Sequence, residues 1–75
     1  MARTQIAQIE FLDQSSQTPA IAIISVIDTQ VAITISRRND GDIEAFLTPA
    51  DAVRLSAALE TAVQAVTSKP TAANR

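Results

Sequence analysis

The chain of 75 residues contains no cysteine and no histidine. These two absences exclude disulfide bonds, thiolate zinc sites and imidazole metal sites. Aromatic residues are scarce as well, because tyrosine and tryptophan are missing and the only two phenylalanines are Phe11 and Phe46. A chain of this length buries only about 60 to 65% of its unfolded surface. Its stability must therefore come from isoleucine and valine packing or from a second chain.

No excess of one charge and no long hydrophobic run is present. Six basic and eight acidic residues give a net charge of -2, which argues against a basic nucleic-acid-binding domain. The longest apolar run, residues 20–27, is interrupted by Ser25 and is far shorter than the roughly 20 residues that cross a bilayer. Residues 1–12 are too polar for the core of a signal peptide. We therefore expect a cytoplasmic protein without a membrane partner.

Residue types that carry out catalysis are few. Without histidine or cysteine, the chain lacks the commonest general base and the strongest nucleophile, and a single glycine excludes a glycine-rich phosphate loop. A pair of carboxylates would need a sheltered pocket, which a chain this short rarely forms. We therefore predict that the protein is not an enzyme and holds no cofactor. The carboxylates from which such a pair could come are Glu10, Asp13, Asp28, Asp42 and Glu44.

Alternating apolar and polar residues predict a first and a third strand in the first half of the chain, and a short isoleucine-rich run predicts a second strand between them. The first contains Ala7, Ile9 and Phe11, although Ile6, Ile9 and Leu12 also fit one helical turn. Residues 13–18 form a polar connection to a second strand, residues 20–27, which is apolar on both faces. A bend at residues 28–30 leads into a third strand. The apolar positions of these later strands are Ile21, Ile23 and Ile27 on one face of the second, Ala22, Ile24 and Val26 on its other face, and Val31, Ile33 and Ile35 in the third.

Asn39, Asp40 and Gly41 predict a hairpin loop before a fourth strand at residues 42–47. Glycine adopts the left-handed conformation of such loops at little cost. Carboxylates around a glycine also occur in calcium-binding loops, but aligning Gly41 with the glycine of an EF-hand puts Ser36 and Arg38 at ligand positions. We therefore predict a turn and no metal site.

Two pairings of the third and fourth strands fit this loop. A three-residue loop sets Ile33 opposite Leu47 and Ile35 opposite Ala45. A two-residue loop sets Ile35 opposite Phe46 and exchanges the two faces of the strand. We favour the three-residue loop because it separates polar from apolar side chains better. It leaves Phe46 on the other face without an evident cover.

The start of a helix follows directly. Thr48 is the predicted N-cap, Pro49 takes the first helical position, and Asp51 opposes the helix dipole in the first turn. The helix is predicted over residues 49–67, with an apolar stripe that faces the sheet. Residues 70–75, from Pro70 onward, are predicted to form a flexible tail. The stripe consists of Ala52, Leu55, Leu59, Ala62, Val63 and Val66.

A resemblance to a known group rests on the same segment. Residues 47–52, Leu-Thr-Pro-Ala-Asp-Ala, followed by Leu55 and Leu59, resemble the hairpin-to-helix ending of small uncharacterised actinobacterial and actinophage proteins. The likeness covers residues 33–66. It implies a short sheet that leads into an alanine-rich helix, and it transfers no active residues.

These observations predict an α+β fold. A three- or four-stranded antiparallel meander at residues 4–47 is covered on one face by the helix, in a single domain at residues 1–69. One helix about 10 Å wide covers only one face of a sheet, so apolar side chains remain on the other. We therefore expect a homodimer or higher oligomer. The predicted interface residues are Ile21, Ile23, Ile24, Val26 and Phe46.

The leading functional hypothesis is a non-enzymatic protein-protein interaction module, whose partner is a second copy or an unidentified protein. The resemblance adds a phage origin to this hypothesis. The alternative is a small dimeric DNA-binding regulator whose hairpin contacts phosphates through Arg37 and Arg38. Neighbouring residues of a strand point to opposite faces, so these two arginines do not form a patch by themselves.

Overall fold

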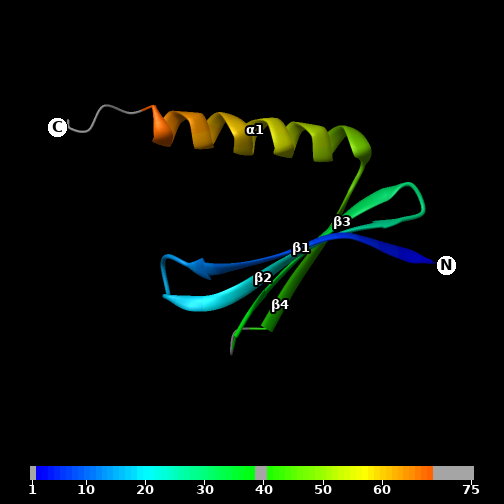
Figure 1. The fold of residues 1–75 in the computed structure, drawn as a ribbon. Coiled ribbons are helices and arrows are strands. Elements are labelled where there is room, and N and C mark those ends of the chain that lie inside the picture. The colour runs from blue at the N-terminus through cyan, green and yellow to red at the C-terminus, as the bar shows by residue number, and fades with distance from the viewer. Residues whose placement is uncertain (1, 39–40, 69–75) are drawn as a thin grey trace.

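The structure, a computed structural model, describes residues 2–38 and 41–68. Four strands, β1 (Arg3–Asp13), β2 (Thr18–Ile27), β3 (Gln30–Arg37) and β4 (Gly41–Leu47), precede one helix, α1 (Pro49–Thr67) (Figure 1). The strands form an antiparallel meander in the order β1-β2-β3-β4. The predicted α+β fold is confirmed, with four strands, and the first segment is a strand rather than a helical turn. The predicted tail lies outside the described residues.

Local polar contacts shape the first turn. The carboxylate of Asp13 accepts hydrogen bonds from the backbone N–H of Ser16 at 3.3 Å and from its hydroxyl at 2.5 Å. The backbone N–H of Gln17, which has a φ of 60°, donates to the carbonyl of Asp13 at 2.6 Å. The Asp13 side chain and one backbone hydrogen bond therefore hold this polar connection in a tight turn.

The turn between β2 and β3 needs no glycine. Ile27 pairs with Gln30, so only Asp28 and Thr29 lie between the strands. Asp28 has a φ of 55°, and aspartate tolerates this left-handed region better than most residues because its short side chain bonds locally. The predicted bend at residues 28–30 is therefore a two-residue turn.

The register of β3 and β4 differs from both predicted pairings. Ile33 lies opposite Ala45 instead of Leu47, and Arg37 lies opposite Gly41. The reason is that Gly41, with a φ of 78°, pairs with Arg37 as the first residue of β4 and is not part of the loop. The loop therefore begins one residue earlier than predicted, at Arg38. The favoured pairing is therefore wrong by two residues. An even shift keeps every side chain on its predicted face.

Residues that pair directly share a face of the sheet, and the registers thereby separate two surfaces of different composition. The first, which we call the apolar face, carries Asp13, Thr18, Arg37 and Gly41 at one end and Thr4 at the other. Its apolar residues are Ala7, Ile9, Phe11, Ala20, Ala22, Ile24, Val26, Val31, Ile33, Ile35, Ile43, Ala45 and Leu47. The second, the mixed face, includes Arg3, Gln8, Glu10, Ile21, Ile23, Ser25, Ala32, Thr34, Glu44 and Phe46.

The predicted N-cap begins α1. The Thr48 hydroxyl accepts a hydrogen bond from the backbone N–H of Asp51 at 3.1 Å, and Pro49 follows at the first helical position. The carboxylate of Asp51 in turn accepts a hydrogen bond from the guanidinium of Arg54 at 3.4 Å. Because this start depends on neighbouring residues alone, the sequence predicts it correctly.

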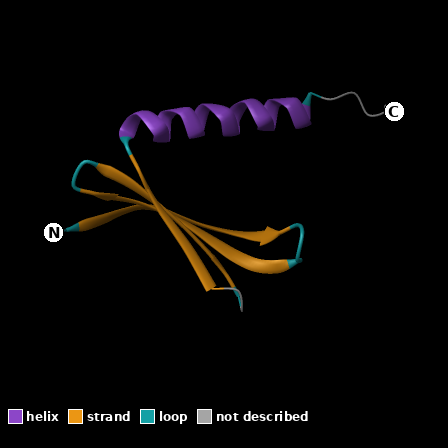
Figure 2. Ribbon diagram, turned by 180° about the vertical axis from the view of Figure 1, so that it is seen from behind, coloured by secondary structure: helices purple, strands orange, loops and turns teal. Residues whose placement is uncertain are grey.

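Helix α1 packs on the apolar face through its first half. Its stripe contacts this face around Leu55, but the exposed fraction of the residue rises from 43% at Leu55 to 61% at Leu59 and 72% at Val66. Both views show α1 starting at the end of β4 and standing apart from the turn between β1 and β2 (Figures 1 and 2). The predicted stripe therefore faces the sheet, while its C-terminal half stays open to solvent.

The buried core of this single chain is very small. Within residues 2–38 and 41–68, the only residues in the buried class are Ala20, Ser25 and Ala32. The radius of gyration is 15.2 Å, whereas a compact domain of this length has about 11 Å. The side chains that should form a core lie instead on surfaces.

Candidate interaction surface

The five predicted interface residues do not form one patch. Ile24 and Val26 lie on the apolar face, whereas Ile21, Ile23 and Phe46 lie on the mixed face. Val26 and Phe46 are exposed, and the three isoleucines are half-buried. The predicted interface residues are therefore divided between the two faces of the sheet.

On the apolar face, a groove of about 330 Å³ runs between α1 and the sheet. Ser56 is the one polar residue among the described residues that line it, and none of them is charged. Such a lining holds no group for acid-base or metal chemistry, but it gains free energy by excluding water. The lining residues are Ile24, Val31, Ile33, Ala52, Leu55, Ser56 and Leu59.

Beyond this groove, a row of apolar residues crosses all four strands. Ile9 pairs with Ala22, Ala22 with Ile35, and Ile35 with Ile43, so these four residues, the open row, lie side by side on the apolar face. Ile9 and Ile43 at its two ends are more than half exposed. Phe11, the next residue of β1 on this face, is exposed as well. The apolar face therefore continues beyond the area that α1 covers.

The mixed face is closed in part by a contact between the two edges of the sheet. Arg3 on β1 binds Glu44 on β4 at 2.7 Å, and its guanidinium lies 5.8 Å from the centre of the Phe46 ring. The Thr34 hydroxyl donates to the same Glu44 oxygen at 2.8 Å. Edge strands meet in this way only if the sheet is strongly coiled. Arg3 thereby supplies a cover for Phe46 that the sequence did not reveal, although the ring stays 51% exposed.

The partners of Glu44 change its acidity. The hydrogen bond from Arg3, followed by that from Thr34, lowers the pKa of the Glu44 carboxyl because both stabilise its charged form. The sequence does not predict the contact between Arg3 and Glu44, because the two residues are 41 positions apart and come together through the coiling of the sheet.

A second ion pair engages one of the arginines predicted to contact nucleic acid. Arg37 binds Asp13 at 3.0 Å across β2, and the pKa of Asp13 is lowered by its hydrogen bond from Ser16 and then by Arg37. Arg38 follows at the end of β3, where its backbone N–H donates to the carbonyl of Pro19 at 3.3 Å. Arg38 lines a hollow with Ile21 and Ser36 of the mixed face, whereas Arg37 binds Asp13 on the apolar face, so the structure does not bring the two arginines together as a basic patch.

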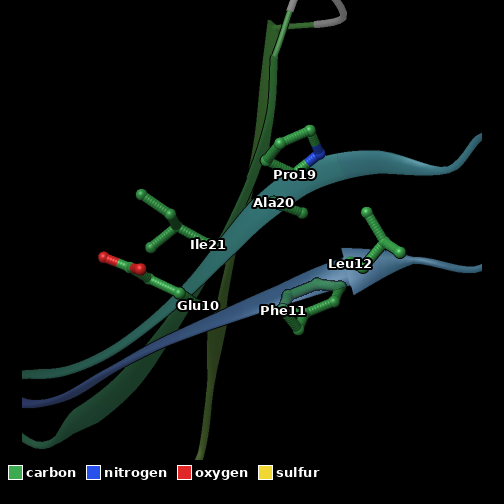
Figure 3. A pocket seen from close by; sticks show the side chains of 6 residues that line it. All are labelled: Glu10, Phe11, Leu12, Pro19, Ala20 and Ile21. Atoms are coloured by element: carbon green, nitrogen blue, oxygen red, sulfur yellow. The ribbon is translucent and has the colours of Figure 1, made fainter.

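A shallow hollow of about 530 Å³ lies beside the β1–β2 turn (Figure 3). Glu10 is the one ionisable side chain among its lining residues, with Ile21 on the same side of the strands. Of the other candidate carboxylates, Asp13 and Glu44 are each bound to an arginine. In the described part of the chain, no three potential metal-ligating side chains gather. Among the described residues that line it, the hollow therefore supplies one carboxylate and no second acid or base.

Comparison with family models, curated proteins and solved structures found no match. The resemblance to actinobacterial and actinophage proteins therefore stays a prediction. Among the described residues, no helix is long and apolar enough to cross a membrane.

Proposed function

We propose that this chain is a non-enzymatic protein-protein interaction module that acts as a homodimer. One observation carries the proposal: within the described residues, the buried class holds two alanines and one serine, while twelve large apolar side chains are exposed. They are Ile6, Ile9, Phe11, Leu12, Val26, Ile43, Phe46, Val53, Leu55, Leu59, Val63 and Val66.

The free energy of folding supports a second chain. Burying a large apolar side chain contributes about 1.5 to 3 kcal/mol, whereas fixing the backbone of each residue costs about 1 to 2 kcal/mol. Small buried residues such as Ala20 and Ala32 offset little of this cost. The chain exposes 5697 Å², although a monomeric protein of 8.0 kDa typically exposes about 4,450 Å². Association of two copies would bury the additional apolar area that one chain leaves exposed.

The rest of the proposal is consistent with this role. The proposal includes a cytoplasmic location and a phage origin. The alternative, a DNA-binding regulator, draws less support from the geometry, because Arg37 is bound to Asp13 and the net charge is -2. Phosphate binding would also have to overcome the repulsion of the eight acidic residues.

The mass in solution tests the homodimer. Light scattering should give a mass near twice the 8.0 kDa of one chain. Ile24→Asp should abolish the dimer or unfold the protein, because it puts a charge into the apolar groove. Gln64→Asp, at an exposed polar position of α1 outside the stripe, is the control and should remain dimeric. A stable 8.0 kDa species that unfolds cooperatively would overturn the proposal.

An electrophoretic mobility assay separates the two functional classes. The interaction module should not shift duplex DNA even at about 50 mM salt, where phosphate contacts are strongest. A shift that Arg38→Ala removes and Arg54→Ala retains would favour the DNA-binding regulator. Arg54 serves as the control because it lies on α1, away from the hairpin.

A further inference from the structure

We infer that two copies associate about a two-fold axis, so that the exposed half of each α1 stripe covers the open row of the partner. This half, the distal stripe, consists of Leu59, Ala62, Val63 and Val66. The inference rests on the proposed homodimer and adds to it which surfaces meet. The occupant of the apolar face is therefore the helix of a second copy.

Each of these two surfaces is incomplete within one chain. The groove under α1 ends at Leu59. Beyond it, the distal stripe and Thr67 line a shallow apolar depression that is open to solvent. On the sheet, the open row continues past the groove with Ile9 and Ile43 exposed. Figures 1 and 2 both show the C-terminal half of α1 standing away from the β1–β2 turn. One chain thus presents an uncovered helix stripe and an uncovered sheet row.

The two surfaces match in length. The distal stripe runs from Leu59 to Val66, which is about 10 Å along a helix that rises 1.5 Å per residue. The open row spans four strands spaced about 4.8 Å apart, or roughly 14 Å. One stripe with its side chains therefore spans one row.

The charge distribution favours a second copy over a charged partner. None of the described residues of the distal stripe or the open row is charged. The two ionised residues of the apolar face, Asp13 and Arg37, neutralise each other at its end. Association therefore removes no unpaired charge from water along the row, and an acidic or basic partner would find nothing there to bind.

Symmetry makes the match reciprocal. A two-fold axis brings the same patch of each chain together. Because stripe and row belong to one chain, one rotation puts each stripe on the opposite row and creates two identical contacts. A partner with only one of these surfaces would leave the other exposed.

The area is sufficient for a stable dimer. Ile9, Ile43, Leu59, Val63 and Val66 are each more than half exposed. Side chains of this size then show roughly 100 Å² each, or roughly 500 Å² for the five. With the smaller residues between them they approach the roughly 600 Å² per partner at the lower end of standard interfaces. The proposed contact therefore accounts for most of the exposed apolar area on this side of the molecule.

Disulfide trapping tests the arrangement, because the chain has no cysteine of its own. Val63→Cys and Ile9→Cys are prepared as separate proteins, mixed in equal amounts and oxidised gently. The intact mass then identifies the mixed disulfide, which can only join two chains. We expect it to form at least tenfold faster than in two control mixtures. The first control mixture contains Gln64→Cys in place of Val63→Cys. The second contains Gln8→Cys, whose side chain belongs to the mixed face, in place of Ile9→Cys.

The outcomes separate this inference from the homodimer itself. Rapid, selective formation of the mixed disulfide supports it. A mixed disulfide no faster than the controls, in a protein whose mass is still that of a dimer, overturns the inference and leaves the homodimer joined through strand edges or the mixed face. A monomeric mass for the unmodified protein overturns both, and the apolar face must then serve a different protein.

Discussion

At the scale of single residues, two ion pairs hold strands that are not neighbours in the sheet. Arg3 joins Glu44 across the mixed face, and Arg37 joins Asp13 across β2. Exposed ion pairs contribute little one at a time, but these two bind both ends of a coiled sheet that has almost no buried core. Their effect should be visible in acid.

Acid should weaken the protein through these carboxylates. The pKa of Asp13 and that of Glu44 are both lowered in the folded protein, from unfolded values of about 3.9 and 4.3. Their stabilising contribution is therefore complete above the unfolded pKa values and is lost as the pH falls through the lower folded values. The temperature of half-unfolding should therefore decrease when the pH falls below about 4.

The double variant Asp13→Asn, Glu44→Gln isolates this contribution. It should be less stable than the unmodified chain at neutral pH and should lose less stability on acidification, as followed by circular dichroism. The same acid dependence in both proteins would show that these ion pairs do not stabilise the fold.

At the scale of elements, the sequence predicts what neighbouring residues determine. The N-cap at Thr48 and the alternation within the strands depend on adjacent positions, and both are confirmed. The predicted register of β3 and β4 is wrong because Gly41 can belong to either the loop or the strand, and the residue pattern does not distinguish these two positions. The contact of Arg3 with Glu44 could not be predicted, because it depends on the coiling of the whole sheet.

The cap at Thr48 should matter more than the other exposed residues of α1. Thr48→Ala removes the acceptor of the Asp51 backbone N–H and should lower the free energy of unfolding by about 1 kcal/mol, measured with urea. Thr48→Ser keeps the hydroxyl and should retain most of the stability. Equal losses in both variants would mean that the methyl group, and not the cap, stabilises the helix start.

At the scale of the whole molecule, the sequence predicts that the chain has more apolar side chains than it can bury. It does not predict on which surface they lie. The isoleucine-rich β2 indicated that both faces need a cover, but Ile24 and Ile21 proved to lie on different surfaces with different coverings. Arg3 partly covers the mixed face. On the apolar face, α1 covers the rows around Ile24 and leaves the open row and the distal stripe to a second chain.

Dependence of stability on concentration tests this account most directly. If folding requires a second copy, each tenfold increase in protein concentration adds about 1.4 kcal/mol to the apparent stability. The thermal unfolding midpoint should then rise by several degrees at every such step. A midpoint that stays constant over a hundredfold range of concentration would contradict the account, because it would show that one chain folds stably with its apolar face exposed.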